Sequence, residues 1–429
     1  MAQAFSPKNK LVIIGGGAAG VFTAINAAEK WQARSETYAI TILEAGASPL
    51  QKVRISGGGR CNVTHKCFDP KLLLTYYPRG QKELPALFSR FQPSDMVTWL
   101  KRHGLHLKTE ADGRMFPIEN TSEAVIDCFL KTARQLGVEI RLRQRVIAVE
   151  KNQNGFLIQT ADGSVLADKL VLATGYSQPG WHLAKTLGHQ IIPPVPSLFP
   201  FKTAPSCLDD LAGISLQHAA GKLSVKPPEI HGVSAKPLRF ESAGPFLITH
   251  QGVSGPLIYR LSALGAKALA DASYQAQLLL DLLPDYSDEE VLALLKNNVQ
   301  VEQGKKQLKN TQFPGLANRL WLALLDSAEV PMDALPQVLS HKLLNRLVER
   351  LKRLPLTVIA KSPSKEEFVS CGGVSLKEVD FKGMQSKRCP NLFLVGEILN
   401  IDGLTGGFNF QACWSAAWTA SEGITAVSE

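Results

Sequence analysis

Apolar residues at the start of the chain follow the pattern of a strand, a helix and a second strand. Residues 10–14 form a short apolar run, residues 18–29 have helical spacing, and residues 39–43 form a second apolar run that ends at Glu44. Short continuous apolar runs fit strands buried on both faces, as in a parallel sheet. The N-terminal segment therefore predicts a βαβ unit.

The next 150 residues predict helices followed by a strand meander. Ser94 is placed to cap a helix that ends at Gly104, and a second helix spans 122–136 before Gly137. Glycines and Asn or Asp at 152–155 and 162–163 have the composition of hairpin turns. They separate predicted strands at 138–142, 146–150, 156–160 and 164–167, and an apolar strand at 169–173 then runs into Gly175.

The residue pattern changes after Gly188, and this change predicts a domain boundary. Four prolines lie between residues 193 and 200, and the chain beyond them has short strand-like segments with Gly and Pro turns. From Ser287, which has capping-box spacing to Glu290, the pattern becomes helical. We expect one discontinuous domain, 1–195 with 371–429, and an inserted domain, 196–370, that is β-rich over 196–283 and helical over 284–354.

Composition agrees with a folded, multidomain chain. At 429 residues it exceeds a single core, and its 45% hydrophobic and 20% charged residues are ordinary for a globular protein. Seven cysteines without a paired framework indicate a reducing compartment, so a cytoplasmic location is expected. The only early apolar run is too short for a signal or a membrane span, so we expect no membrane association.

The net charge of +9 raises the question of an anionic partner. The densest basic cluster lies at residues 342–353, where leucines recur at helical spacing, so we interpret it as the charged face of an amphipathic helix. Nucleic acid is therefore not the expected partner. An RNA-binding patch remains the alternative, and it predicts binding that weakens with added salt.

The turn after the first strand carries a nucleotide-binding pattern. Gly15, Gly17 and Gly20 give G-x-G-x-x-G between strand and helix, and Glu44 ends the next strand. These glycines permit a tight turn, close approach of a pyrophosphate and close helix packing, while the acid binds ribose hydroxyls. The helix N-terminus would then face the phosphates.

The C-terminal segment is predicted to form a second wall of the cofactor site, beside the N-terminal βαβ unit. A second wall favours a permanently bound flavin over an NAD that binds transiently. Gly396-Glu397 follows a predicted strand at 392–395, and Asp402-Gly403, Gly406-Gly407 and Asn409 precede a helix. Glycines there let the backbone lie against the flavin. No second G-x-G-x-x-G follows a strand, so NAD(P)H would dock only transiently.

A further glycine-rich stretch, Ser56–Asn62, exposes backbone N–H groups to an anion, and Arg54 and Arg60 are candidates to pair with phosphates. Cys61 and Cys67 lack the spacing of a redox pair, so packing is the expected role of Cys61. No cysteine has neighbours at metal-ligand spacing, and we expect no metal site.

These motifs, taken in order, resemble the bacterial BaiN/YhiN-type flavoproteins, which include aminoacetone-oxidase-like and bile-acid-reductase-like members. The resemblance covers nearly the whole chain and rests on Gly15–Gly20, on Ser56–Asn62 and on three further stretches. These are Gly113–Pro117, Thr249–Pro256 and Cys371–Val374, together with the segment from Gly396 to Gln411.

The resemblance implies an α/β fold: an FAD-binding Rossmann-like domain of the two-dinucleotide-binding type, formed by both chain ends and interrupted by a β-plus-helical domain. Glu397 departs from the aspartate that many such flavoproteins carry. The FAD contacts that the resemblance implies are Gly15, Gly17, Ala18, Gly20, Glu44, Ala45, Arg54, Ser56, Gly57, Gly58, Cys61, Asn62, Val146, Ala173, Thr174, Gly175, Gly396, Glu397, Asp402 and Gly403.

We therefore expect an FAD-dependent oxidoreductase that passes hydride between a small organic substrate and the flavin, with NAD(P)H or dioxygen as the other partner. His250 and the loop 252–256 are candidates for the substrate face, because histidine exchanges protons near neutral pH. The alternatives are an RNA-associated flavoprotein and a flavin-binding protein without turnover. The catalytic acid or base is not identified by the sequence.

Overall fold

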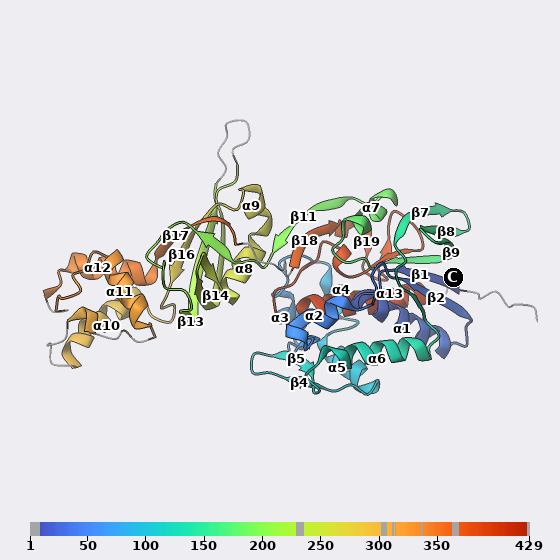
Figure 1. Ribbon diagram of the computed structural model, residues 1–429, viewed down its shortest axis with the longest axis horizontal. Helices are drawn as coiled ribbons and strands as arrows, with labels where there is room; N and C mark the ends of the chain where they lie inside the picture. The colour runs from blue at the N-terminus through green and yellow to red at the C-terminus, as the bar shows by residue number, and fades with distance from the viewer. Residues whose placement is uncertain are drawn as a thin grey trace, which may run out of the picture. The chain divides into compact units, whose positions relative to one another are not determined.

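The computed structural model describes residues 9–228, 236–301, 307–310, 313, 315–335, 338–362 and 369–426. The chain divides into two compact units, Met1–Pro194 with Cys371–Glu429 and Val195–Ser370. The sequence placed these divisions after residues 195 and 370. Both units are drawn in Figure 1, and each is described by itself below.

The first unit is built on a seven-stranded sheet to which both chain ends contribute. Its order is β19-β20-β21-β10-β1-β2-β6. The five strands from β21 to β6 run parallel, and β19 and β20 form an antiparallel edge. The strands are β1 (Asn9–Ile14), β2 (Tyr38–Leu43), β6 (Glu139–Arg141), β10 (Lys169–Leu172), β19 (Val379–Asp380), β20 (Gln385–Ser386) and β21 (Leu392–Leu394).

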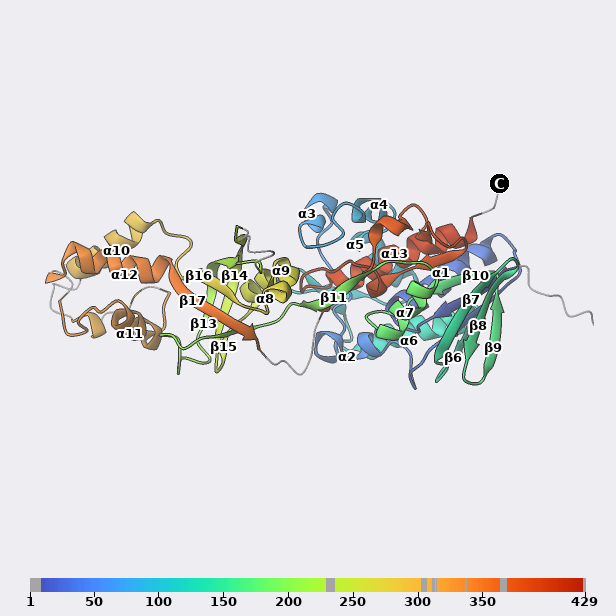
Figure 2. The same cartoon turned by 90° about the horizontal axis from the view of Figure 1, so that it is seen from above.

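This sheet confirms the predicted α/β class and corrects one detail. The segment at 138–142 was predicted to open a meander, but β6 pairs in parallel with β2, where Ile140 lies opposite Ile42. The meander itself has only three strands and forms a separate layer (Figure 2). Its strands are β7 (Val146–Asn152), β8 (Gly155–Thr160) and β9 (Gly163–Ala167).

Two long helices form the core beside the sheet. Helix α1 (Ala18–Ala33) and helix α13 (Phe408–Thr425) are buried over most of their length, and the Phe22 and Trp414 rings meet with centroids 5.3 Å apart. The remaining elements of this unit are α2 (Gln51–Gly59), α3 (Pro70–Leu74), α4 (Leu84–Phe88), α5 (Pro93–Arg102), α6 (Ser122–Gln135), α7 (Gln178–Thr186), the 3-10 turns η3 (Leu376–Glu378) and η4 (Gly396–Ile398), and a small sheet of β3 (Thr64–His65), β5 (Arg114–Pro117) and β4 (Leu107–Thr109).

Helix α5 starts earlier than predicted. Gln92, not Ser94, is its N-cap: the Gln92 N–H donates to the Asp95 carboxylate at 2.8 Å and Pro93 occupies the first helical position. Proline is suited to that position because its missing N–H would be unpaired there in any case.

The second unit contains a closed six-stranded barrel, in the order β12-β15-β14-β13-β16-β17. Strands β11 (Ile191–Ser197) and β18 (Val369–Val374), which pair with each other, carry the chain across the division. The barrel strands are β12 (Phe201–Thr203), β13 (Ser215–Val225), β14 (Leu238–Thr249), β15 (Gly252–Ser254), β16 (Ala276–Asp281) and β17 (Leu354–Lys361).

Helices lie both inside and after the stretch predicted to be β-rich. Helices α8 (Pro256–Leu264) and α9 (Ala266–Asp271) precede β16, and β17 completes the barrel after the helical segment. The helical segment holds α10 (Asp288–Val301), η1 (Leu308–Asn310), α11 (Asn318–Ser327) and α12 (His341–Lys352). In the part of the chain that the structure describes, no helix combines the length and the apolar character needed to span a bilayer.

Candidate functional site

The turn between β1 and α1 has the geometry that its glycines predict. Gly15 has φ +109°, and a Cβ there would lie 2.4 Å from the Ala173 carbonyl oxygen. A Cβ on Gly20 would lie 2.0 Å from the Gly15 oxygen. A side chain at either position would collide with backbone, so both glycines are required by the fold.

Gly17 differs from these two because the space in front of it is open. A Cβ built on Gly17 would meet no other described part of the chain within 4 Å. Gly17 is the N-cap of α1 and supplies no capping side chain, and the first intrahelical bond runs from Val21 N to Gly17 O. The space beside Gly17 is therefore open at the N-terminus of α1, where unpaired N–H groups bind phosphate oxygens in other proteins.

Glu44 lies beside the same turn. One carboxylate oxygen accepts from Gly16 N at 2.7 Å and the other from Gly46 N at 2.6 Å. These two bonds fix the carboxylate at the carboxyl end of β2, where a nucleotide ribose lies in dinucleotide-binding folds. Ala45, the next predicted contact, is exposed.

The second glycine-rich stretch forms the kinked end of α2. The helix breaks at Ser56, and Gly57, Gly58 and Gly59 have φ of +57°, +69° and +81°. Cβ atoms on Gly58 and Gly59 would meet nothing within 4 Å in the described chain, so this turn presents open backbone.

The two arginines predicted to pair with phosphates are engaged elsewhere. Arg54 forms an ion pair with Glu123, and Arg60 pairs with Glu110 at 2.7 Å while lying 4.1 Å over the Phe116 ring. Local spacing could not indicate these acids, because each lies at least 50 residues from its arginine. Both guanidiniums are thus held in ion pairs within the protein, and their contact with a phosphate stays a prediction.

Cys61 and Asn62 follow this turn and serve packing. Cys61 is fully buried, and burial raises the pKa of its thiol to about 12, so the thiol is not a nucleophile near neutral pH. In the amide orientation that satisfies both groups, the Asn62 side chain donates to Thr64 O at 3.0 Å and accepts from Gly407 N at 2.9 Å. Asn62 thus ties the second glycine-rich stretch to the C-terminal segment.

The C-terminal wall packs closely on the N-terminal βαβ unit. Gly396 has φ +77°, and a Cβ there would come within 2.8 Å of the Ala19 side chain on α1. Gly403 and Asn409 exchange two hydrogen bonds of 2.8 Å, which hold the loop before α13. Trp414 Nε1 donates to Val63 O at 2.9 Å. Segments more than 300 residues apart in sequence therefore form one site.

Glu397 has a partner that the sequence did not indicate. Lys52 on α2 approaches the Glu397 carboxylate at 2.5 Å. Burial lowers the pKa of Lys52, but the attraction and hydrogen bond of Glu397 outweigh it, so the pKa is raised overall. A small pocket next to this pair is lined by Gly396, Glu397, Asn409 and Cys413, among others. Burial raises the pKa of Cys413 as well, which keeps its thiol neutral.

Asp402 was expected to contact the flavin, but its carboxylate forms an ion pair with Arg79. The Asp402 side chain has no exposed surface, and the Arg79 side chain is 20% exposed. Burial lowers the pKa of Arg79, and the Asp402 hydrogen bond and charge reverse this and raise it. The pair links the loop before α13 to the segment that precedes α4, a contact between residues 323 positions apart.

The end of β10 lies between the two walls. Thr174 Oγ1 is buried and has no hydrogen-bond partner among the described residues. Gly175 has φ +62°, and a Cβ there would lie 4.0 Å from the Glu397 carboxylate. Val146 lies apart from them, at the start of β7, paired with Thr160. A buried hydroxyl without a partner is what a polar cofactor group would satisfy, so these residues fit FAD.

His250 and the loop 252–256 belong to the second unit. His250 is exposed on the turn between β14 and β15. Gly252 has φ +147°, and a Cβ there would lie 2.4 Å from the Phe201 oxygen, so this glycine is needed for barrel pairing. A substrate role for His250 remains a prediction.

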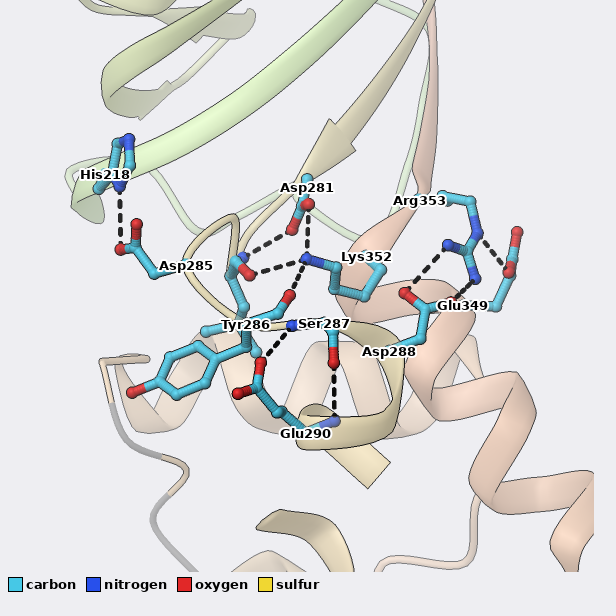
Figure 3. Close-up of polar contacts among 11 residues, drawn as sticks. His218, Asp281, Asp285, Tyr286, Ser287, Asp288, Glu290, Glu349, Lys352 and Arg353 are labelled. Carbon is cyan, nitrogen blue, oxygen red and sulfur yellow. Dashed lines mark hydrogen bonds and ion pairs between the residues drawn. The ribbon is translucent and has the colours of Figure 1, made fainter. Parts of the chain in front are cut away.

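The basic cluster at 342–353 has the amphipathic form that its spacing predicts. Leu344, Leu347 and Leu351 are buried on one face of α12. Lys352 pairs with Asp281 at 2.7 Å and donates to the Leu283 and Tyr286 carbonyls. Figure 3 shows Lys352 directed toward Asp281, and Arg353 directed toward Asp288 and Glu349. The charges of Lys352 and Arg353 are therefore paired with carboxylates of the second unit. The described residues contain no His, Cys, Asp and Glu group that could hold a metal.

The family profile described as the HI0933-like protein Rossmann domain matches residues 9–423. The chain belongs to the HI0933-like family. Similar proteins include the ribosomal RNA dihydrouridine synthase of Escherichia coli (strain K12), 27% identical over 97% of this chain and 98% of that protein. The 3-dehydro-bile acid delta(4,6)-reductase of Clostridium scindens is 25% identical over 96% and 98%.

Among solved structures, the 3-ketosteroid delta1-dehydrogenase from Sterolibacterium denitrificans is similar to this HI0933-like chain with a TM-score of 0.48. It is 11% identical and covers 97% of this chain and 99% of its own. Family membership confirms the expected class: the protein is an FAD-dependent oxidoreductase.

Proposed function

We propose that the protein is an FAD-dependent reductase that adds hydride to a carbon–carbon double bond conjugated with a carbonyl group, with NAD(P)H as the source of electrons. When bound and reduced by NAD(P)H, the flavin would supply the hydride to the carbon remote from the carbonyl, and a proton would complete the neighbouring carbon. The names of two relatives support this reaction. A dihydrouridine is a uridine saturated across such a bond, and a delta(4,6)-reductase removes double bonds from a keto compound.

The meeting of both chain ends around the turn at Gly15–Gly20 is the observation that carries the proposal. Gly17 and Ala18 would bind the diphosphate at the tip of α1, and Glu44 would bind the ribose. Thr174 and Glu397 would hold the ribityl chain and ring, and the two hydrogen bonds between Gly403 and Asn409 would keep the neighbouring loop in place. Helices α1 and α13, which are buried over most of their length, would keep water away from one side of the FAD site.

An anaerobic cuvette experiment tests this function. The purified protein should show the visible flavin band, and NADH or NADPH should bleach it. An enone-type acceptor should then restore the band and appear as its saturated product. Protein that remains colourless with added FAD contradicts the cofactor assignment. Reoxidation by dioxygen alone, with no enone turnover, would make the protein an oxidase instead.

RNA is the second candidate for the substrate, with a uridine base as the acceptor. Two relatives are named as ribosomal RNA dihydrouridine synthases, and both align over nearly their full length. The distribution of charge favours the same candidate. The 47 basic and 38 acidic residues divide into 28 and 21 in the first unit and 19 and 17 in the second. The basic excess therefore lies with the flavin site, and not with the basic helix α12.

A further inference from the structure

A pocket in the first unit, apart from the residues assigned to FAD, collects positive charge. It has a volume of about 290 Å³ and is lined by Gln190, Ser375, Lys377, Glu378, Lys387 and Arg388. These residues come from the segment after α7, from the η3 turn and from the end of the β19–β20 hairpin. Three of the six side chains are cationic and one is a carboxylate.

The carboxylate is fully used inside the protein. Glu378 is buried, and one of its oxygens accepts from Gln190 N at 2.9 Å and from His189 Nδ1 at 3.1 Å. The other oxygen accepts from Arg388 Nε at 3.2 Å. Glu378 therefore holds Arg388 at the pocket, and the pocket as a whole keeps a net positive charge.

Behind Glu378 lies a Ser–His–Glu chain that resembles a hydrolytic triad but cannot act as one. Because His189 Nδ1 donates to Glu378, its Nε2 accepts from the Ser386 hydroxyl at 2.9 Å. The Ser386 oxygen in turn accepts from the backbone N–H groups of Arg388, at 3.0 Å, and Cys389, at 2.8 Å. Ser386 is buried and its hydrogen-bonding capacity is used. The chain is a rigid support for the pocket rim.

The two lysines remain available to a ligand. Lys377 and Lys387 are exposed, and the Lys387 ammonium makes one hydrogen bond, to Lys377 O at 3.2 Å. Lysine, arginine, serine and glutamine side chains are among the groups that contact nucleic-acid phosphates. A polyanion also matches the basic excess of the whole unit, which one small phosphate would not use.

We propose that this pocket binds a backbone phosphate of an RNA strand and so positions the RNA on the flavin-containing unit. The inference rests on RNA as the substrate, the second candidate above. It adds the residues that recognise the strand: Lys377 and Lys387 as mobile cations, Arg388 as a cation fixed by Glu378, and Ser375 and Gln190 as neutral donors.

Salt-dependent binding tests the pocket. The FAD-loaded protein is titrated against a fluorescently labelled, uridine-rich single-stranded RNA at KCl concentrations from about 50 to 200 mM. Each phosphate contact on a single strand contributes about 0.7 to the slope of log K against log salt. Lys377→Gln with Lys387→Gln should therefore lower the slope by about 1.4 and weaken binding roughly tenfold at low salt.

Lys382→Gln is the matched control, because Lys382 is an exposed lysine of the same hairpin that does not line the pocket. It should bind RNA as the wild type does. Flavin content and bleaching by NAD(P)H should be unchanged in all variants. Three outcomes overturn the proposal: a wild-type slope in the double variant, an equal loss in Lys382→Gln, or a loss confined to the KM for NADPH.

Failure of this site is distinguishable from failure of the proposed reaction. A wild-type protein that binds no RNA at low salt removes both the RNA candidate and this pocket. The same protein would still bleach with NAD(P)H and reduce an enone if the hydride-transfer proposal holds.

Discussion

Several charged side chains of the candidate site form ion pairs with residues far away in the chain. Arg54, Glu397 and Asp402 were expected to contact FAD and Arg60 to pair with a phosphate, and each has an ion-pair partner at least 50 residues distant. Residue type and local spacing identify a group that binds anions or hydroxyls, but they do not show which opposite charge folds beside it. Pairings of this kind therefore could not be predicted from the sequence.

The buried pair of Asp402 and Arg79 should be worth more than any exposed pair. Asp402→Asn leaves the Arg79 charge without its carboxylate in a largely buried position, which costs about 3–5 kcal/mol when a buried pair loses one member. Urea denaturation at saturating FAD measures the loss. Asp112→Asn, which breaks the exposed pair with Arg114, should cost at most about 1 kcal/mol. Equal losses in the two variants would contradict this account.

His189 should make stability depend on pH in one window. Burial lowers its pKa from the usual 6.5, so in the folded protein it stays neutral while the unfolded chain takes up a proton. Stability should therefore fall as the pH drops from 6.5 to the folded-state value. Uptake of one proton by the unfolded chain lowers the free energy of unfolding by at most about 1.4 kcal/mol for each pH unit inside this window.

A test of whether His189 causes this pH dependence compares the wild type with His189→Gln. The free energy of unfolding is measured for both at about pH 7.5 and pH 5.5. The free energy of unfolding should change less between the two pH values in His189→Gln than in the wild type. Glu378, whose pKa is lowered although burial opposes this, loses its contribution only at more acidic pH, below its usual 4.5. An unchanged pH dependence in the variant would assign the effect to other groups.

At the scale of elements, local pattern predicted the main helices and strands around the proposed FAD site. β1, α1, β2, α6 and α13 lie where their periodicity placed them, to within a few residues. These elements are specified by the burial of their own apolar positions. The closure of the barrel by pairing of β17 with β12 and the pairing of β6 with β2 join residues far apart in the chain, such as Phe201 with Lys361 and Ile42 with Ile140, and no local pattern indicates them.

A substitution at the N-terminus of α1 should weaken FAD binding without a large loss of stability. Gly17→Ala is compatible with φ −79° and meets no described atom within 4 Å, so it should cost about 1 kcal/mol or less as a weaker N-cap. The added methyl occupies the space assigned to the diphosphate, so the Kd for FAD should rise at least tenfold, or about 1.4 kcal/mol.

Gly15→Ala is the contrasting variant, because its φ of +109° and a 2.4 Å contact with the Ala173 oxygen strain the backbone itself. It should lose about 1–3 kcal/mol of stability as well as FAD. Circular dichroism and flavin fluorescence titration distinguish the two variants. Wild-type FAD affinity in Gly17→Ala would place the diphosphate elsewhere.

At the scale of the whole molecule, each unit has its own core. The barrel and its helices share one cluster of buried side chains, all between residues 199 and 358. The proposed FAD contacts all lie in the other unit, 1–194 with 371–429. A ligand stabilises only the part that it binds, so FAD should act on one unit and leave the other unchanged.

Calorimetry of the protein with and without FAD tests this division. Two unfolding transitions are expected, and flavin fluorescence, which rises on release, identifies the first unit. FAD at about 100 times its Kd should add about 2.7 kcal/mol to that unit alone, so its removal lowers one midpoint and leaves the barrel transition in place. A single transition that moves as a whole would mean that the units unfold together, and movement of the barrel transition alone would place FAD in the inserted unit.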